Sequence, residues 1–181
     1  MLIRPDEHSI VRRVKVLNGE ELALLDTTGT LTKKYQAQIV PGPVDAELIA
    51  AEDTAALSPS TSLGNDRGFD ARPSDNPVHG SILPITEIFE RLRPLIGTRF
   101  RNAGQIQERN RGGALHRLIT ERLKYRLHSD DGQFPDVRHQ LLEVKLQTSP
   151  TIDLGVVLPN SSVALDVTKV GDCQPCARDV R

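Results

Sequence analysis

GQFPDVRHQLLEVKLQTSPTIDLG, residues 132–155, is the stretch that decides the fold prediction. Its apolar runs are separated by turn-forming residues, which predicts strands over 134–137, 141–146 and 152–158. A segment with helical spacing of apolar residues comes before them. The order of helix, strand, turn and strand therefore predicts an α/β domain.

Two acids and one lysine in this stretch form a candidate catalytic cluster. Asp136 lies on the first predicted strand, and Glu143 and Lys145 are two residues apart on the second, so both project from one face. Carboxylates can hold Mg²⁺, which polarises a phosphodiester and lowers the pKa of a bound water. A lysine beside the metal can orient that water and offset charge in the transition state. We therefore predict Asp136 and Glu143 as Mg²⁺ ligands and all three residues as catalytic.

The same residues resemble a known family signature. Pro135-Asp136 followed by Glu143-Val144-Lys145 is similar to the PD-(D/E)xK motif of the restriction-endonuclease-like nucleases. Lys145 is the only one of the six lysines with an acid two residues before it. The preceding NRGGALHRLITERL (110–123) also resembles the helix before this motif in mismatch-repair nicking endonucleases and related restriction enzymes. The resemblance covers about residues 109–158.

The resemblance implies a fold, an activity and partners. The fold is a restriction-endonuclease-like core, in which helices flank a mixed sheet. The activity is type II restriction-like, that is, Mg²⁺-dependent, sequence-specific hydrolysis of double-stranded DNA, and such enzymes usually act as homodimers. A helix glutamate often supports the metal site in this family. Glu121 is the candidate here, one position out of register because Thr120 falls where the acid is expected. The alternative for Glu121 is a surface salt bridge within the helix.

Two helices are predicted before the cluster. Pro84 begins the first, and Pro94 is expected to kink its end. The second is expected to begin after Gly112-Gly113. Their apolar residues recur at helical spacing and are Ile85, Ile88, Phe89, Leu92, Leu95 and Ile96 in the first helix and Leu115, Leu118, Ile119, Leu123 and Leu127 in the second.

The N-terminal part is predicted to be a small β-rich segment. Residues 10–17 are rich in Val and Ile, Asn18-Gly19 is typical of a hairpin turn, and residues 20–25 continue the apolar run. Residues 35–40 alternate apolar and polar side chains, as a half-buried strand does.

Composition divides the chain into three parts. We predict a β-rich segment over 1–57, a loop or linker rich in Ser, Pro, Gly, Asn and Asp over 58–81, and a nuclease core over 82–181. No obvious terminal element follows Leu158, whereas the family usually adds more strands and helices. The core is therefore expected to be incomplete at its C-terminal end.

Basic residues are concentrated between positions 91 and 128. Ten Lys or Arg residues lie in this window, against two acids, in a chain whose net charge is -1. A solvated helix face explains such a run by itself, but beside a phosphodiester-cleaving cluster it favours contact with the DNA backbone. The candidate contacts are Arg109, Arg111, Arg117 and Lys124.

Several other classes of protein are disfavoured. The 181 residues fit one domain, and they contain no signal-peptide core and no stretch near the roughly 18 to 20 apolar residues of a membrane span. Cys173 and Cys176 are too few for a disulfide framework or, without further ligands, a zinc site. The expectation is a cytoplasmic protein without a membrane partner.

Two alternatives to the nuclease stay open. One is a DNA-binding or truncated remnant that keeps the fold and no longer cuts. The other, more distant, is an aspartyl-phosphate phosphatase, because Asp26 begins a DTTGTLT stretch that resembles the phosphatase nucleophile loop. That chemistry needs further Lys and Asp residues around Mg²⁺, and no suitable acid pair follows.

Overall fold

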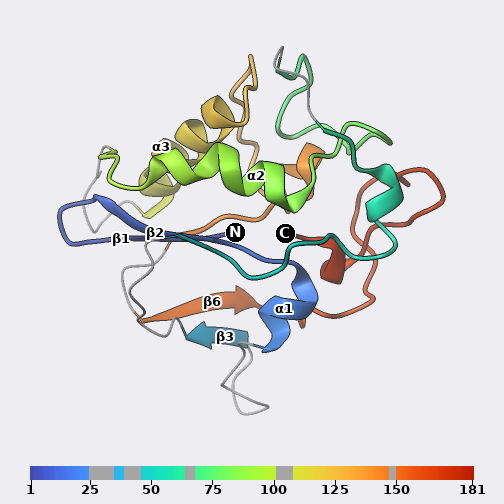
Figure 1. The fold of residues 1–181 in the computed structure, drawn as a ribbon, viewed down its shortest axis with the longest axis horizontal. Helices are drawn as coiled ribbons and strands as arrows, with labels where there is room; N and C mark the ends of the chain where they lie inside the picture. The colour runs from blue at the N-terminus through green and yellow to red at the C-terminus, as the bar shows by residue number, and fades with distance from the viewer. Residues whose placement is uncertain (25–34, 39–45, 64–67, 101–107, 147–149) are drawn as a thin grey trace.

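A computed structural model describes residues 1–24, 35–38, 46–63, 68–100, 108–146 and 150–181. It is a mixed α/β structure with one four-stranded and one two-stranded sheet (Figure 1). The four-stranded sheet has the order β4-β2-β1-β5. Its strands are β1 (Leu2–Pro5), β2 (Val11–Val16), β4 (Ala46–Leu48) and β5 (Lys145–Leu146). The smaller sheet pairs β3 (Tyr35–Gln38) with β6 (Thr151–Gly155).

The larger sheet is mixed, as predicted. Strand β1 pairs with β2 antiparallel and with β5 parallel, and β2 pairs with β4 parallel. The sheet thus joins three strands from the first 57 residues to the strand that begins at Lys145. The prediction of a mixed α/β fold with helices is confirmed.

Two helices cover one side of this sheet (Figure 1). Helix α2 (Ile85–Leu92) follows Pro84, and the chain continues into the 3-10 helix Arg93–Leu95, which contains Pro94. Helix α3 (Glu108–Arg122) begins earlier than predicted: Gly112 and Gly113, expected to precede the helix, lie inside it. Together with β1 and β2 the helices enclose a mainly aliphatic core, whose members include Ile3, Val14, Val16, Leu83, Ile85, Ile88, Leu92, Leu95, Leu115, Ile119 and Leu123.

The predicted Asn18-Gly19 hairpin is wrong. A helix, α1 (Gly19–Leu24), starts there instead. The Asn18 side-chain oxygen accepts a hydrogen bond from the backbone N–H of Glu21 at 2.8 Å, so Asn18 caps the helix. Gly19 has a different reason to be glycine: a Cβ there would lie 2.3 Å from the Pro159 carbonyl oxygen and 2.6 Å from the Arg178 Cα. Close approach of another backbone, and not a turn, selects the small residue.

The loop over 58–81 packs against the C-terminal half of the chain. Beyond the 3-10 helix Ser58–Ser60, its described residues form isolated bridges, including Phe69 with Tyr125. The Phe69 ring lies 4.9 Å from the Tyr125 ring and 5.2 Å from the His139 ring, centre to centre. The segment is therefore irregular in structure, but its contacts are those of a packed loop.

A buried ion pair joins the end of the chain to the segment before α2. The Arg181 and Asp53 side chains are 1% and 5% exposed, and Nη1 of Arg181 lies 3.0 Å from Oδ1 of Asp53. The Arg181 guanidinium also donates to the carbonyl oxygens of Leu83 and Gln140. Burial lowers the pKa of Arg181, and the charge of Asp53 opposes this shift.

Within the described part of the chain, no helix has the length and apolar character needed to cross a bilayer.

A second buried polar group is His139, which is 2% exposed. Its Nδ1 lies 2.9 Å from the Tyr125 hydroxyl and 3.1 Å from the Gln140 amide nitrogen, and its Nε2 lies 3.3 Å from the Ser81 hydroxyl. Burial raises the pKa of Tyr125, so this hydroxyl keeps its proton. Because the Gln140 amide nitrogen can only donate and Tyr125 holds a proton to donate, Nδ1 accepts and the neutral ring is favoured.

This arrangement predicts loss of stability in acid. Burial lowers the pKa of His139 below 6.5, although the charge of Asp75 opposes the shift. The unfolded chain therefore takes up the proton first, and this contribution to stability is present above about pH 6.5 and lost as the pH falls towards the folded-state pKa. We expect His139→Gln to flatten the pH dependence of the unfolding free energy between pH 7 and 5, measured by urea denaturation.

The matched control is His8→Gln, because the His8 side chain is 70% exposed and makes no such buried contacts. It should keep the pH profile of the parent, and comparison within one background removes the effect of the other titrating groups. An unchanged acid slope in His139→Gln would show that this histidine does not limit stability at low pH.

Candidate active site

The candidate cluster is built around a tight turn. Val137 and Leu142 exchange backbone hydrogen bonds of 2.9 and 3.1 Å, and the 3-10 helix Arg138–Gln140 closes the turn between them. Leu141 follows with φ of 51°, in the left-handed region. The predicted strand pair is thus much shorter than expected, but its turn brings Asp136 opposite Glu143.

Each of these two carboxylates accepts a hydrogen bond from a backbone N–H on the opposite side of the turn. The Asp136 N–H donates to Oε2 of Glu143 at 3.1 Å, and the Val144 N–H donates to Oδ2 of Asp136 at 2.8 Å. A carboxylate that accepts a backbone N–H is held in direction as well as in place. The two side chains therefore fix one another across the turn.

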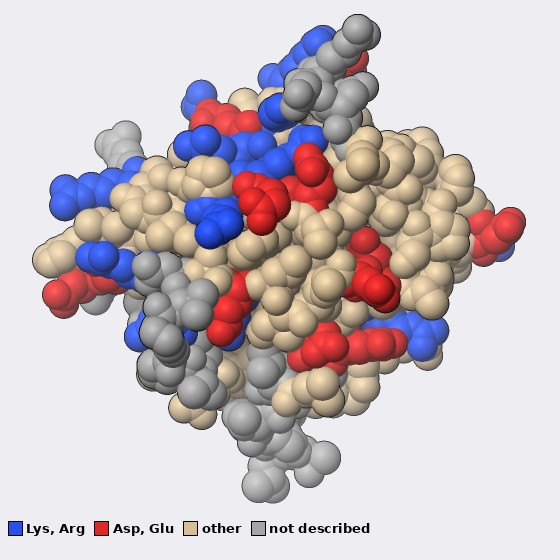
Figure 2. Space-filling model, in the orientation of Figure 1, with Lys and Arg blue, Asp and Glu red and all other residues tan. Residues whose placement is uncertain are grey.

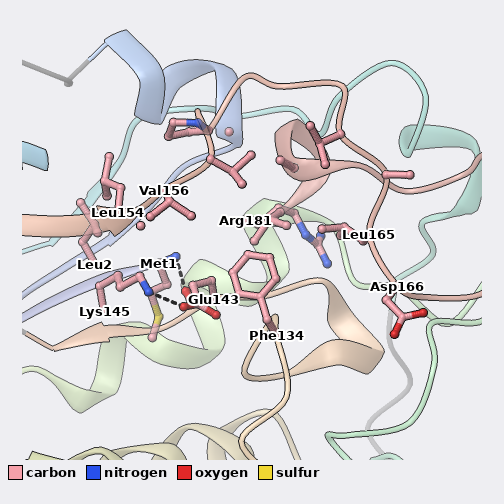
Figure 3. Close-up of a pocket in the computed structure, with 18 residues that line it drawn as sticks. Met1, Leu2, Phe134, Glu143, Lys145, Leu154, Val156, Leu165, Asp166 and Arg181 are labelled. Carbon is pink, nitrogen blue, oxygen red and sulfur yellow. Dashed lines mark hydrogen bonds and ion pairs between the residues drawn. The ribbon is translucent and has the colours of Figure 1, made fainter. Parts of the chain in front are cut away.

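Lys145 completes the group. Its ammonium forms an ion pair with Oε1 of Glu143, and the two side chains are 30% and 15% exposed. This is the contact that the two-residue spacing predicts. Dashed lines in Figure 3 join Glu143 to the Lys145 ammonium and to the amine of Met1.

Both ends of the chain lie along the segment that carries Glu143. The Met1 amine donates to the Glu143 carbonyl oxygen at 2.8 Å, and the Lys145 N–H donates to the Met1 carbonyl oxygen at 3.2 Å. The Glu143 N–H donates to the Arg181 carbonyl oxygen at 2.9 Å, and the Arg181 N–H donates to that of Leu141 at 2.8 Å. Burial lowers the pKa of the Met1 amine to about 5. No local sequence pattern predicts either contact, because both join residues more than 35 positions apart.

Asp136 is a carboxyl group whose surroundings disfavour its charged form. Burial, and after it the charge of Glu143, raise its pKa to about 7, although the Val144 N–H and Lys145 act in the opposite direction. Asp136 is thus held in a place that disfavours its negative charge. A cation at this position would offset that effect.

The cluster faces two cavities. Glu143 and Lys145 line one of about 450 Å³ (Figure 3). Most of its other side chains are apolar and include Met1, Leu2, Phe134, Leu154, Val156, Val157, Val163, Leu165 and Val180. Asp136 lines the other, of about 540 Å³, with Gly112, Gly113, Leu115, His116, Asp130, Asp131, Gly132, Val144 and Leu146. The two acids therefore lie at the partition between an apolar and a polar cavity.

Glu121 is placed differently from the cluster. Its carboxylate lies 2.9 Å from Nε of Arg117, on the exposed face of α3, and it lines neither cavity. Thr120, at the position where the family resemblance expects an acid, is fully buried and hydrogen-bonds His128 at 2.8 Å. The structure thus brings together Asp136, Glu143 and Lys145 but pairs Glu121 with Arg117, which is the salt bridge that the sequence left as its alternative.

Several arginines of the predicted basic region form ion pairs with acidic side chains. Arg91, Arg93 and Arg126 form ion pairs with Glu87, Glu90 and Asp70 respectively, in addition to the pair between Arg117 and Glu121. Figure 2 shows blue and red side chains intermixed on the side of the molecule where α2 and α3 lie. Three of these four acids lie outside the window of residues 91–128, so the local excess of positive charge is smaller than the sequence window indicates.

Three of the predicted residues have side chains outside the described part of the structure. Arg109 and Arg111 belong to α3, but their side chains lie outside the described residues, as does Asp26 with its DTTGTLT stretch. The described part of the chain has no group of three or more His, Cys, Asp or Glu side chains arranged to hold a metal. The Asp136–Glu143 pair provides two carboxylates. Cys173 and Cys176 are both free thiols.

Comparisons with models of known protein families, with curated proteins and with solved structures found no match. Any function proposed for this chain therefore depends on its own residues and their geometry.

Proposed function

We propose that this chain is a Mg²⁺-dependent endonuclease of the PD-(D/E)xK kind, with a restriction-endonuclease-like core, which hydrolyses phosphodiester bonds of double-stranded DNA. The observation that carries the proposal is the meeting of Asp136, Glu143 and Lys145 at one turn. Two carboxylates held at one turn, with an ammonium paired to one of them, are the kinds of group that metal-assisted phosphodiester hydrolysis uses.

The residues fit a divalent cation by their chemistry. Carboxylate oxygens are the ligands that Mg²⁺ prefers, and Asp136 and Glu143 would hold it. Burial and the charge of Glu143 raise the pKa of Asp136 to about 7, and this supports a cation here because a bound cation would offset both effects. Bound Mg²⁺ would supply charge stabilisation at the phosphate and a more acidic water.

The chain's own groups have separate roles in this proposal. Lys145 places a positive charge where the phosphate gains negative charge, and Glu143 holds the ammonium in direction through their ion pair. The basic residues of α3 and its C-terminal end, among them Arg117 and Lys124, would contact the DNA backbone without reading its sequence. A homodimer would present one such site to each strand.

The test is cleavage of a mixture of long double-stranded DNAs, so that any short recognition sequence is present. We expect cleavage with Mg²⁺ or Mn²⁺, and binding without cleavage with Ca²⁺, whose coordination is looser. The matched variant is Glu143→Gln, which keeps the size and one of the two acceptor oxygens but removes the charge. It should bind DNA and cut far more slowly.

Two results would contradict the proposal. Cleavage that survives complete chelation of divalent cations would exclude the metal-assisted mechanism. Tight DNA binding without cleavage under every metal would favour the DNA-binding remnant instead, and gel-shift measurements on the same samples distinguish that outcome from a protein that does not bind DNA.

A further inference from the structure

His116 lies on the inner face of α3, where its side chain meets the candidate cluster. It is 6% exposed, and its Nε2 lies 3.2 Å from the backbone carbonyl oxygen of Asp136. A carbonyl oxygen can only accept, so the ring donates its proton from Nε2. The ring also lines the polar cavity that Asp136 lines.

This contact completes the hydrogen bonding of Asp136. Its N–H is bound by Glu143 and its carboxylate by the Val144 N–H, both across the turn. Its carbonyl oxygen is bound by His116 and by the side-chain amide of Gln133. Gln133 is three residues before Asp136 in the same loop, whereas His116 comes from helix α3.

The helix that carries His116 is firmly packed. Leu115, Ile119 and Leu123 of α3 and the turn after it are at most 1% exposed, and all three belong to the main core. A support that comes from a packed helix holds its target more closely than one that comes from a loop. His116 therefore ties the backbone of Asp136 to helix α3, in addition to the anchoring of the turn itself by Val137 and Leu142, which also belong to the main core.

We propose that His116 is a positioning residue, which holds the backbone of Asp136 so that its carboxylate stays on the Val144 N–H and its own N–H stays on Glu143. Among the described residues, the hydrogen bond of His116 is made with Asp136, and its effect on any reaction passes through Asp136. Its catalytic consequence rests on the proposed nuclease function, but its structural consequence does not. The test therefore measures the two separately.

Three variants isolate the hydrogen bond. His116→Phe keeps an aromatic ring in the helix and removes the donor. His116→Gln restores an N–H donor the same number of bonds from the backbone as Nε2. Ile119→Val is the control, because it loosens the packing of α3 one turn away without touching Asp136.

The first measurement is amide hydrogen exchange by NMR, which needs no activity. In His116→Phe we expect the Asp136 and Val144 amides, which donate across the turn, to exchange on the order of 10-fold faster relative to those of Val137 and Leu142. His116→Gln should restore the parent ratio and Ile119→Val should keep it. Equal protection in His116→Phe and the parent would overturn the proposal, as would the same local change in Ile119→Val.

The second measurement is DNA cleavage with Mg²⁺. Loss of a group that supports a metal ligand typically lowers activity by about 10- to 100-fold. We expect His116→Phe to lose this much in kcat with KM within about two-fold, and His116→Gln to recover most of it. A parent that cuts and a His116→Phe variant with unchanged kcat would overturn the catalytic part. A parent that never cuts, with the exchange pattern as expected, would refute the nuclease and leave the positioning role in place.

Discussion

Lys145→Ala is expected to lower the rate of DNA cleavage by about 100-fold or more while DNA affinity stays close to that of the parent. The ammonium lies beside Glu143 and acts on charge that appears in the transition state, so its removal affects kcat more than binding. Single-turnover cleavage and fluorescence anisotropy, measured on the same DNA, provide the two quantities.

Lys124→Ala is the matched control, since it removes the same charge from the end of α3. If Lys124 meets a phosphate, this variant should weaken binding and lower the slope of log affinity against log salt by about one counterion, with little change in single-turnover rate. The two lysines should therefore separate turnover from affinity. A Lys145→Ala enzyme that cuts at the parental rate would show that the catalytic assignment is wrong.

Asp53→Ala is expected to destabilise the fold by about 3–5 kcal/mol, which is a large part of the stability of most small domains. It leaves the Arg181 guanidinium, whose side chain is 1% exposed, without its 3.0 Å partner. It also removes the acceptor 3.3 Å from the Ile85 N–H, at the start of α2. Urea denaturation measures the loss.

Two further variants separate the causes. Asp53→Asn keeps an oxygen acceptor for the Ile85 N–H and removes the charge, so it should lie between the parent and Asp53→Ala. Glu121→Ala breaks an exposed ion pair, in which the Arg117 and Glu121 side chains are 71% and 45% exposed, and should have a much smaller effect. Equal losses in Asp53→Ala and Glu121→Ala would mean that the buried charge is not the cause.

Sequence patterns over about ten residues correctly predicted those helices and strands that are determined by their own residues. The apolar spacing after Pro84 predicted α2, and the Val-rich run over 10–17 predicted β2. Asn18-Gly19 misled the prediction because the same dipeptide suits both a hairpin and a helix start. The close approach of Pro159 and Arg178 to Gly19 is a contact between distant segments, which no local pattern contains.

The candidate site divides in the same way. The spacing of Glu143 and Lys145 predicted their contact, and the turn before them placed Asp136 opposite. The contacts of Met1 and His116 with this turn depend on how distant segments pack, and the sequence did not indicate them. The helical spacing does place His116 on the inner face, because it comes directly after Leu115 and three residues before Ile119 in the apolar stripe.

The hydrogen bonds of Asp136 and Glu143 across the turn require a particular side-chain length at each position. A glutamate at 136 would keep the charge, but its extra methylene would carry the carboxylate past the Val144 N–H that now holds it. An aspartate at 143 would fall short of the Asp136 N–H for the opposite reason. Side-chain length therefore matters at both positions as much as charge does, because each carboxylate must reach a fixed backbone N–H.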